Sequence, residues 1–585
     1  MKSSALIKPY FTQNKLFIFI GLISLIVVDL LQLLIPLVIK WAVDDLTAFR
    51  ADSKGLIMYA FYVVGIALAI GVFRYIWRRC LIGMSRQVEE GLRNKLFAHI
   101  QTLSAPYFAE TKTGDLMAHA TNDIQHIRMA TGMGIVALTD ALVLGTAAIG
   151  FMAAIHLRLT IYVLIPMPFI VLSARFFTKR MHHNYQAVQG AFADLTEVVR
   201  ERFAGIRIIK AYNREKESGA GVQTASKAYV DKNLKLARIM RSFFPMMLFF
   251  SNMSLGLVLL LGGRQTIKGS ITPGEFVAFI SYIGMLTWPM MATGWVMNLI
   301  QRGKASLDRI HQILQTPPQI TDSPGAVALE HIRGEIVFEN VSFSYASNDY
   351  ADATPVIVEI DLKLKPGQTL GIVGPPGSGK TTLLGLVPRI FDVSQGRILI
   401  DGVDIRNVRL EDLRSRIGFM PQEPFLFAAS IRENIMFDDS RPQNSVLINA
   451  AKAASLHGTV QALPDGFETL VGEKGIILSG GQKQRVALAR TMLYSKPILI
   501  LDDPISQVDS ETGNDIINRL RSLTGKMTLI IVSHRLSAVH FADHIVVLEQ
   551  GRIAESGTHA QLMESDRYYA RTYRMQELEE VMHAR

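Results

Sequence analysis

One stretch of the chain reads Leu370-Gly371-Ile372-Val373-Gly374-Pro375-Pro376-Gly377-Ser378-Gly379-Lys380-Thr381, and a helical run from Thr382 to Val387 follows it. The apolar start predicts a buried strand, so the glycine-rich loop lies between a strand and a helix. In this setting the glycines let backbone N–H groups converge on phosphate oxygens, and the helix N-terminus adds its dipole. The stretch therefore predicts a nucleotide-binding loop.

Two side chains of this loop have distinct roles at such a site. Lys380 neutralises the β- and γ-phosphates, and Thr381 supplies a hydroxyl to Mg²⁺. ATP and Mg²⁺ are therefore the expected cofactors. The residues expected to hold the nucleotide are Gly374, Pro375, Gly377, Ser378, Gly379, Lys380, Thr381 and Thr382.

Two further apolar runs end in polar residues that suit the same site. The run Ile498-Leu499-Ile500-Leu501 is followed by Asp502 and Asp503, which is the Walker B pattern. Asp502 is expected to reach Mg²⁺ directly or through water, and the next acid stands where a base or water-positioning carboxylate is needed. The run Leu529-Ile530-Ile531-Val532 is closed by Ser533 and His534, which places His534 where it can contact the γ-phosphate.

A second anion-binding pattern lies about a hundred residues after the phosphate loop. The sequence Leu478-Ser479-Gly480-Gly481-Gln482 precedes a helical run from Lys483 to Leu493. A Ser-Gly-Gly turn at a helix N-terminus is itself an anion site. Because it stands on its own helical segment, it need not serve the nucleotide that the phosphate loop holds.

Outward from these motifs, the chain divides near residues 315–334. Two breaker clusters, Gln315-Thr316-Pro317-Pro318 and Asp322-Ser323-Pro324-Gly325, stop helices there. From Gly334 onward strands and helices alternate, which predicts an α/β domain with a mostly parallel sheet. The expected domains are a transmembrane domain (1–315), a linker (316–334), a nucleotide-binding domain with a helical subdomain (335–575) and a tail (576–585).

The first half of the chain is predicted to span a membrane. Hydrophobic residues make up 49% of the 585 residues and charged residues 19%, and the mean hydropathy is +0.24. Six stretches are long and apolar enough to cross a bilayer, namely 16–39, 56–80, 131–155, 159–178, 244–267 and 274–300. The net charge of +10 would suit nucleic acid, but the basic residues flank these stretches, so a nucleic-acid partner is not expected.

The connections between the stretches alternate in length and charge. The connections after the second and fourth stretches are long, and they carry roughly eight and fourteen Lys and Arg residues, from Arg74 to Arg128 and from Arg175 to Arg241. By the positive-inside rule these two connections, the N-terminus and the C-terminal domain are cytoplasmic. The expected location is the cytoplasmic membrane of a bacterium.

Each long connection reads as a helical arm with a turn at its tip. Helical periodicity covers Ser85–Leu103 and Ala187–Arg202. The expected tips are Lys112-Thr113-Gly114-Asp115, followed by Ala120 to Asp123, and Ala204-Gly205-Ile206-Arg207. A short helix at each tip would dock on another domain, and the alternative is a solvated helical hairpin.

The N-terminal segment resembles a signal peptide only at first sight. Lys2, Lys8 and Lys15 precede the stretch 16–39, which is too long for a signal core and lacks a cleavage site, so it is interpreted as a retained anchor. Ala5–Asn14 is expected to lie on the membrane surface. The single cysteine, Cys80, excludes an internal disulfide framework and a cysteine zinc cluster.

Polar and methionine side chains inside the stretches leave two interpretations open. Asp29 and Asp140 either line a substrate cavity or form hydrogen bonds between helices; Gln32, Arg74, Asn252 and Asn298 are the other polar residues. The last two stretches are rich in methionine and tryptophan, whose side chains either form a deformable apolar surface or serve ordinary helix packing. These residues are Met246, Met247, Met253, Met285, Met290, Met291, Met297, Trp288 and Trp295.

Taken with the signature Leu478–Gln482, the whole chain resembles an ABC exporter half-transporter of the bacterial multidrug or lipid type, most of all one subunit of a heterodimeric multidrug exporter with a degenerate ATP site. In that family two halves dimerise head to tail, and each ATP lies between the phosphate loop of one subunit and the signature of the other. The resemblance implies that Tyr345 stacks on adenine and that Gln422 acts at the catalytic site and on Mg²⁺ with Thr381 and Asp502. It implies that Ser479, Gly480, Gly481 and Gln482 contact the ATP of the partner, and that His534 is the switch histidine. The run Leu470–Gly475 resembles a segment that touches the arms.

The chain departs from this family after Walker B. Active members have glutamate where this chain has Asp503, and Ser506-Gln507-Val508-Asp509 replaces the usual Ser-Ala-Leu-Asp. The aspartate carboxylate lies roughly 1.5 Å further back, and a displacement of that size costs on the order of a hundredfold in rate. The economical hypothesis is a heterodimer with a weak site at Asp503 and a strong one completed by the intact signature.

The leading functional hypothesis is ATP-driven export of amphipathic compounds, either drugs or lipids, with a second half-transporter and membrane lipids as partners. The catalytic residues are expected to be Asp503, His534 and Gln422. One alternative is a non-pumping regulatory or sensor subunit, which Asp503 would suit. Another is a homodimeric exporter of lipids or peptides, for which no N-terminal peptidase domain is present to support peptide processing.

Overall fold

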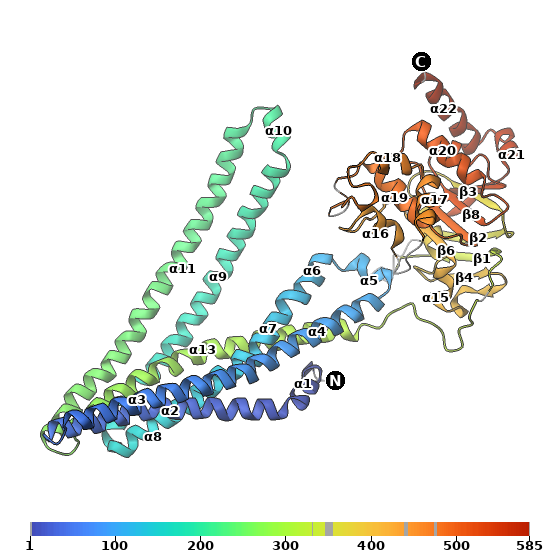
Figure 1. Cartoon of the computed structure of the whole chain (residues 1–585). Coiled ribbons are helices and arrows are strands. Elements are labelled where there is room, and N and C mark those ends of the chain that lie inside the picture. Colours follow the sequence, from blue (N-terminus) through green and yellow to red (C-terminus); the bar gives the residue numbers. More distant parts are fainter. Residues whose placement is uncertain are drawn as a thin grey trace. The chain divides into compact units, whose positions relative to one another are not determined.

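The structure is a computed structural model that describes residues 3–329, 331–345, 355–437, 443–472, 475 and 477–583. The chain forms two compact units (Figure 1). The first, the helical unit, comprises residues 1–101 and 113–316, and the second, the nucleotide unit, comprises residues 102–112 and 317–585. Both units are discontinuous, since the segment 102–112 leaves the first arm and belongs to the nucleotide unit.

The helical unit is built from long helices joined by short ones. Its α-helices are α1 (Lys8–Gln13), α2 (Lys15–Thr47), α3 (Ser53–Trp77), α4 (Gly83–Thr102), α6 (Thr113–Ala118), α7 (Ile124–Met129), α8 (Ile135–Leu164), α9 (Met167–Ala204), α10 (Ile206–Ala211), α11 (Glu215–Leu257), α12 (Gly263–Ile267) and α13 (Pro273–Gln315). A 3-10 helix, η1 (Ser3–Leu6), precedes them, and π-helical turns join some of them: η2 (Arg78–Ile82), η3 (His119–Asp123), η4 (Ala130–Gly134) and η5 (Val258–Gly262).

Among the residues that the structure describes, five continuous helical runs are long and apolar enough to cross a membrane: Lys15–Thr47, Ser53–Thr102, Thr113–Leu164, Glu215–Ile267 and Pro273–Gln315. The predicted stretch 159–178 is not among them, because it is divided between the end of α8 and the start of α9. Pro166 and Pro168 lie at this break, and Arg175 follows soon after it. The crossing by residues 159–178 therefore stays a prediction.

The short connection expected near residue 156 coincides with a backbone change inside α8. His156 has φ −158° and ψ 99°, which is extended and not helical. Its Nδ1 accepts a hydrogen bond from the backbone N–H of Leu159, at 3.1 Å, so the side chain caps the short helical piece that follows.

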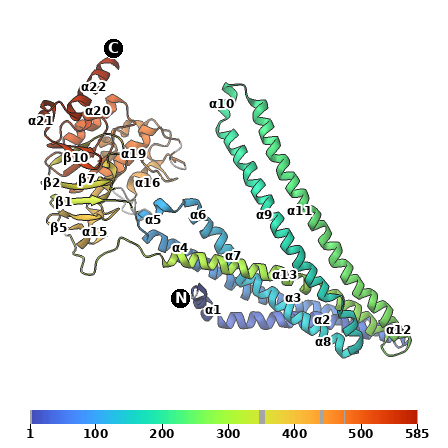
Figure 2. The same ribbon diagram turned by 180° about the vertical axis from the view of Figure 1, so that it is seen from behind.

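The second arm is a hairpin of α9 and α11 with α10 at its tip. The two long helices pack against each other along their length, and their ring contacts include Phe177 with Phe243 and Phe192 with Tyr229. Both views show this hairpin projecting away from the bundle of α2, α3, α8 and α13 (Figures 1 and 2). The tip predicted near Gly205 is thus confirmed.

Polar contacts in the bundle core join helices that lie far apart in the sequence. The hydroxyl of buried Tyr282, on α13, donates to the backbone carbonyl of Leu33, on α2, at 3.0 Å. At another level, the buried carboxylate of Asp123 accepts hydrogen bonds from Ser306 and from the guanidinium of Arg309, which joins η3 to α13. Such a satisfied buried carboxylate fixes the register between two helices.

The nucleotide unit contains two sheets. A four-stranded antiparallel sheet has the order β2-β1-β4-β5, with β1 Ile336–Phe343, β2 Ile357–Leu364, β4 Gln395–Ile400 and β5 Val403–Asp404. A six-stranded sheet has the order β10-β9-β3-β8-β7-β6, with β3 Thr369–Val373, β6 Ile417–Met420, β7 Ile498–Asp502, β8 Thr528–Val532, β9 His544–Glu549 and β10 Arg552–Gly557. All its pairs are parallel except β9 with β10, which confirms the mostly parallel sheet predicted from the apolar runs.

Apolar clusters lie on both faces of the six-stranded sheet, which explains why β3, β7 and β8 are buried along their whole length. The α-helices of this unit are α5 (Ala105–Glu110), α14 (Lys380–Leu386), α15 (Leu410–Ser415), α16 (Ile431–Met436), α17 (Asn444–Ala453), α18 (His457–Gln461), α19 (Gly480–Met492), α20 (Ser510–Arg521), α21 (His559–Glu564) and α22 (Tyr568–His583). The boundary expected between residues 575 and 576 falls inside α22, so the predicted tail begins within a helix.

Candidate nucleotide site

The parallel strands bring the predicted site residues to one edge of the six-stranded sheet. The phosphate loop follows β3, Asp502 ends β7 and Asp503 follows it, Ser533 and His534 follow β8, and Gln422 comes two residues after β6. Since β6, β7, β8 and β3 are successive neighbours in register, their carboxyl ends meet at the same edge. Crevices at the carboxyl ends of parallel strands are where α/β domains bind ligands.

The phosphate loop is wrapped around its own lysine. Lys380 begins α14 and is buried, and its Nζ donates to the carbonyl oxygens of Gly374 and Pro375, at 2.9 and 2.8 Å, and to Ser378 Oγ at 3.3 Å. Burial lowers the pKa of Lys380, and the nearby carboxylates of Asp502 and Asp503 act in the opposite direction. The ammonium group therefore lies where the phosphates of a nucleotide could replace the loop carbonyl oxygens as its hydrogen-bond partners.

Glycine is required in this loop for both conformation and space. Gly374, Gly377 and Gly379 have φ values of 148°, 76° and 98°, a region that other residues rarely adopt. A Cβ on Gly374 would lie 2.1 Å from the carbonyl oxygen of Leu548, and one on Gly379 would lie 2.9 Å from that of Val356. The backbone therefore approaches its neighbours as closely as the predicted motif requires.

Asp502 has the properties of a ligand for a divalent cation. Burial raises its pKa, while a hydrogen bond from Thr381 opposes that shift. Its Oδ2 is buried and has no hydrogen-bond partner among the described residues. A hard cation such as Mg²⁺ prefers oxygen ligands and takes one or two carboxylates together with phosphate oxygens. In the part of the chain that the structure describes, no cluster of three or more His, Cys, Asp or Glu side chains offers another metal site.

Asp503 is fixed by its backbone and by one side-chain contact. Its φ of 53° is left-handed, a region in which aspartate is enriched among non-glycine residues. Its N–H donates to the carbonyl of Val532 at 2.8 Å, and its Oδ1 accepts from Ser533 Oγ at 3.3 Å. The neighbouring His534 is exposed, so its imidazole lies at the edge of the sheet and not in the core.

Tyr345 contributes an aromatic surface beside the loop. Its ring is 45% exposed and meets Phe343 and Phe391 edge to face, with centroids 4.9 and 5.4 Å away. Its hydroxyl forms a hydrogen bond with Thr382 Oγ1 at 2.9 Å. The ring is therefore anchored to α14, the helix that the phosphate loop begins.

The signature lies at the N-terminus of a different helix, α19. Ser479 and Gln482 form a capping box: Ser479 Oγ accepts from the N–H of Gln482 at 3.3 Å, and Gln482 Oε1 accepts from the N–H of Ser479 at 2.9 Å. The side-chain oxygen of Gln482 is thus engaged within the helix cap. Gly480 is exposed and Gly481 is half-buried. None of the hydrogen bonds described in the structure joins the signature to the phosphate loop.

Two glutamines that sequence reasoning did not select connect the signature helix to Asp503. Gln484 is fully buried on α19, and its Nε2 donates to the backbone carbonyl of Asp503 at 2.6 Å and to Ser506 Oγ at 3.0 Å. Its Oε1 accepts from the N–H of Gln507 at 3.0 Å. The Gln507 side chain in turn lies against Gly480. The only signal in the sequence was a polar residue on the apolar face of α19.

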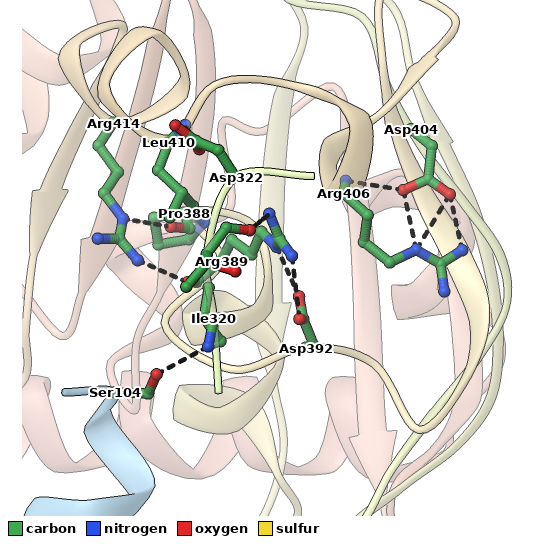
Figure 3. A network of polar contacts seen from close by, with 11 residues as sticks. Ser104, Ile320, Asp322, Pro388, Arg389, Asp392, Asp404, Arg406, Leu410 and Arg414 are labelled. Atoms are coloured by element: carbon green, nitrogen blue, oxygen red, sulfur yellow. Dashed lines mark hydrogen bonds and ion pairs between the residues drawn. The ribbon is translucent and has the colours of Figure 1, made fainter. Parts of the chain in front are cut away.

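A polar network joins the end of α14 to the linker and to the tip of the first arm (Figure 3). Arg389, just after α14, is buried; it pairs with Asp392 at 2.7 Å and donates to the carbonyl of Thr321 at 3.3 Å. In the linker, the N–H of Ile320 donates to Ser104 Oγ at 2.9 Å. Ser104 immediately precedes α5, so the short helix at this tip is α5, which comes earlier in the chain than predicted.

The same network fixes the backbone that leaves the phosphate-loop helix. Arg414 donates to the carbonyls of Pro388 and Arg389, at 3.1 and 2.8 Å. Burial lowers the pKa of Arg414, and the adjacent charge of Arg389 acts in the same direction. Within the segment predicted to touch the arms, Glu473 and Lys474 lie outside the described residues, as does the side chain of Met291 in the methionine-rich set.

Comparison with known proteins agrees with this architecture. Residues 18–290 match the family model of the ABC transporter transmembrane region, and residues 357–506 match that of the ABC transporter. The chain is similar to a solved structure of a bacterial Atm1-family ABC exporter with ATP bound, with a TM-score of 0.77 and 25% identity, over 98% of this chain and 99% of that one.

Curated relatives match over nearly the full length. The multidrug resistance-like ATP-binding protein MdlA of Escherichia coli (strain K12) is 35% identical over 96% of this chain and 94% of its own. The probable multidrug resistance ABC transporter ATP-binding/permease protein YheI of Bacillus subtilis (strain 168) is 35% identical over 96% and 95%. The ATP-dependent lipid A-core flippase of Syntrophus aciditrophicus (strain SB) is 32% identical over 95% and 92%. With its membrane-length helices and its nucleotide unit on one chain, this protein belongs to the ABC exporter half-transporters, which bind and hydrolyse ATP.

Proposed function

We propose that the chain exports amphipathic compounds, drugs or lipids, across the cytoplasmic membrane of a bacterium, with both termini in the cytoplasm. The observation that carries this proposal is a phosphate loop wrapped around the buried Lys380, on the same chain as the five membrane-length helical runs of the described residues. The names of the relatives refer to multidrug resistance and to a lipid A-core flippase, and they support drugs or lipids as the substrate class.

The active form is a dimer in which each nucleotide is shared. Lys380, Asp502 and Asp503 form a buried group at one sheet edge, whereas at the start of α19 Gly480 is exposed and Gly481 is half-buried. Since the Gln482 side chain caps its own helix, the backbone N–H groups of Gly480 and Gly481 and the hydroxyl of Ser479 are left for an anion. A second subunit that brings its own nucleotide to this surface would complete the arrangement.

Within the site each residue has a separate task. The loop from Gly374 to Thr382 binds the phosphates, with Lys380 as the counter-charge, and Tyr345 offers its ring to adenine. Thr381 and Asp502 would hold Mg²⁺ together with Gln422, which follows β6, the strand next to β7 in the sheet. When bound, Mg²⁺ would neutralise charge on the phosphate oxygens. Asp503 orients the attacking water, and His534 contacts the γ-phosphate.

The two sites of the dimer are unequal, and the dimer is a heterodimer. Asp503 is held back by its own backbone and by Ser533, so its shorter carboxylate has little freedom to advance. The intact signature serves the ATP of a partner that carries glutamate. This chain's own site is therefore the slower one.

ATP-dependent uptake of a fluorescent amphipathic dye into inside-out vesicles tests the transport proposal. Vesicles that contain the chain and its partner should accumulate dye with ATP and not with ADP, and Lys380→Ala should reduce uptake. ATP binding without any uptake, for dyes and labelled lipids alike, would favour a regulatory subunit instead. Equal losses of turnover from Asp503→Ala and from the partner's Glu→Gln change would contradict the unequal sites.

A further inference from the structure

On the C-terminal helix α22, the side chain of Gln576 forms two hydrogen bonds with the turn that carries His534. The amide Nε2 donates to the backbone carbonyl of His534 at 2.8 Å, and the amide Oε1 accepts from the backbone N–H of Leu536 at 2.9 Å. One side chain thus satisfies two backbone groups on either side of Arg535. A planar amide that binds twice fixes the orientation of the turn as well as its position.

The other side of the same turn is bound to the acid that follows Walker B. Ser533 Oγ accepts from the N–H of Arg535 at 3.0 Å and donates to Asp503 Oδ1 at 3.3 Å. The N–H of Ser533 donates to the carbonyl of Ile372, on β3, at 3.4 Å. His534 therefore stands between two anchors, one in the sheet and one on α22, while its own side chain is exposed.

The helix that supplies Gln576 is itself firmly seated. Tyr569 and Ala570, in its first turn, are fully buried. The hydroxyl of Tyr569 forms a hydrogen bond with Nδ1 of His559 at 2.8 Å, and Tyr569 stacks with Tyr573, with ring centroids 6.2 Å apart. The position of Gln576 is thus set by packing two turns earlier in the helix.

We propose that Gln576 is a positioning residue for ATP hydrolysis, which acts by holding the His534 turn where the imidazole can reach the γ-phosphate. This inference rests on the proposed function, in which His534 contacts that phosphate. A reactive group that moves by about 1 Å loses on the order of a hundredfold in rate. If the His534 turn were held on one side only, hydrolysis would lose part of that rate. Nucleotide binding at the phosphate loop would not depend on how the turn is held.

The test uses the purified full-length transporter, with its partner subunit, in lipid nanodiscs and in an Asp503→Glu background, in which this chain's own site is expected to hydrolyse faster. Gln576→Ala removes both hydrogen bonds, and Gln576→Met keeps the shape of the side chain without them. Both should lower kcat for ATP by about tenfold, with KM for ATP and the affinity for a fluorescent ATP analogue within about twofold of the parent. Glu577→Ala, on the exposed side of the same helix, is the matched control and should leave kcat unchanged.

A double-mutant cycle with His534→Ala decides whether Gln576 acts through the histidine. If it does, Gln576→Ala should lower kcat by less than twofold when His534 is already alanine. Additive losses, or a fall in melting temperature accompanied by a rise in KM, would show a merely structural role and overturn the inference. If His534→Ala lowers turnover and both Gln576 variants do not, the inference alone is wrong. If His534→Ala has no effect, the proposed role of His534 is wrong, and the inference falls with it.

Discussion

Two helix N-termini in the nucleotide unit are suited to anions, and they are built in different ways. At α14, the preceding residue Gly379 is left-handed and no side chain caps the helix, but Lys380 is buried beside Asp502 and Asp503. At α19, a capping box between Ser479 and Gln482 closes the helix, and the turn is formed by an exposed glycine, Gly480, and a half-buried one, Gly481. The first N-terminus has its counter-charges and its cation ligands from its own chain.

The second N-terminus offers backbone dipoles and one hydroxyl, and little else. A helix dipole at the surface contributes typically 0.3–1 kcal/mol to an interaction with a charge, which is too little to hold a nucleotide alone. From this difference we infer that α14 belongs to a binding site complete in one chain, and we propose that α19 contributes one face of an interface to a nucleotide that is already bound elsewhere. Changes at the two places should therefore differ in what they affect.

The largest effect is expected at α14. Lys380→Ala removes a buried cation that contacts the loop carbonyls and that lies beside Asp502 and Asp503. Nucleotide affinity at this site should fall more than a hundredfold, measured by equilibrium binding of a fluorescent ATP analogue. Lys526→Ala, at an exposed position, is the control. Unchanged affinity in Lys380→Ala would break the distinction between the two N-termini.

A smaller loss with a different signature is expected at α19. A Cβ on Gly481 would lie 2.5 Å from the backbone carbonyl oxygen of Gln507, so Gly481→Ala must displace the turn between Ser506 and Asp509. We expect turnover of the assembly to fall roughly thirtyfold, while binding of the analogue to this chain's own loop stays within about twofold. Gly458→Ala, where nothing lies within 4 Å of the new methyl group, should change neither. Loss of binding in Gly481→Ala would contradict the comparison.

A gain is expected from Asp503→Glu. The longer carboxylate should advance toward the phosphates and raise turnover at this site several-fold. Glutamate tolerates the left-handed backbone of this residue less well than aspartate does, so stability should fall by about 1 kcal/mol. Steady-state ATPase assays and thermal unfolding measure the two changes separately. A lower turnover with an unchanged melting temperature would show that Asp503 already has the optimal length.

The smallest effect concerns the pH dependence of stability without nucleotide. Burial raises the pKa of Asp502 in the folded chain, and the nearby charge of Asp503 adds to this. Over the interval from the ordinary aspartate value up to the raised one, the folded chain binds more protons than the unfolded chain, so the contribution of Asp502 to stability falls as pH rises. Asp502→Asn should flatten this part of the unfolding curve. Parallel curves for the two proteins would show that Asp502 does not titrate differently on folding.

Local patterns in the sequence predicted the parts of the site that depend on neighbours in the chain. The runs at Leu370–Val373, Ile498–Leu501 and Leu529–Val532 became β3, β7 and β8 with ends shifted by at most one residue. Their apolar, β-branched composition is sufficient to define strands that are buried on both faces. The glycines of the phosphate loop were likewise predictable, because each is needed for a local backbone conformation that favours glycine.

Contacts between distant elements were not predictable in this way. Gln484 and Gln576 act on groups 19 and 42 residues away, and a glutamine in a helix carries no pattern that names such a partner. The stretch 159–178 stays a predicted crossing, because it is divided at Pro166 between the end of α8 and the start of α9. The tip of the first arm was placed too late because turn-forming residues after Thr111 outweighed the short helix α5.

The division of the nucleotide unit between residues 102–112 and 317–585 has a consequence for synthesis of the protein. Between residue 112 and residue 317 the ribosome adds 205 residues (317 minus 112), which takes roughly 10–40 s at bacterial elongation rates of about 5–20 residues per second. During that time the later residues of the nucleotide unit have not been made, so Ser104 Oγ lacks the hydrogen bond that the N–H of Ile320 donates to it. Assembly of the nucleotide unit therefore requires that residues made after residue 317 capture a segment that was translated long before them.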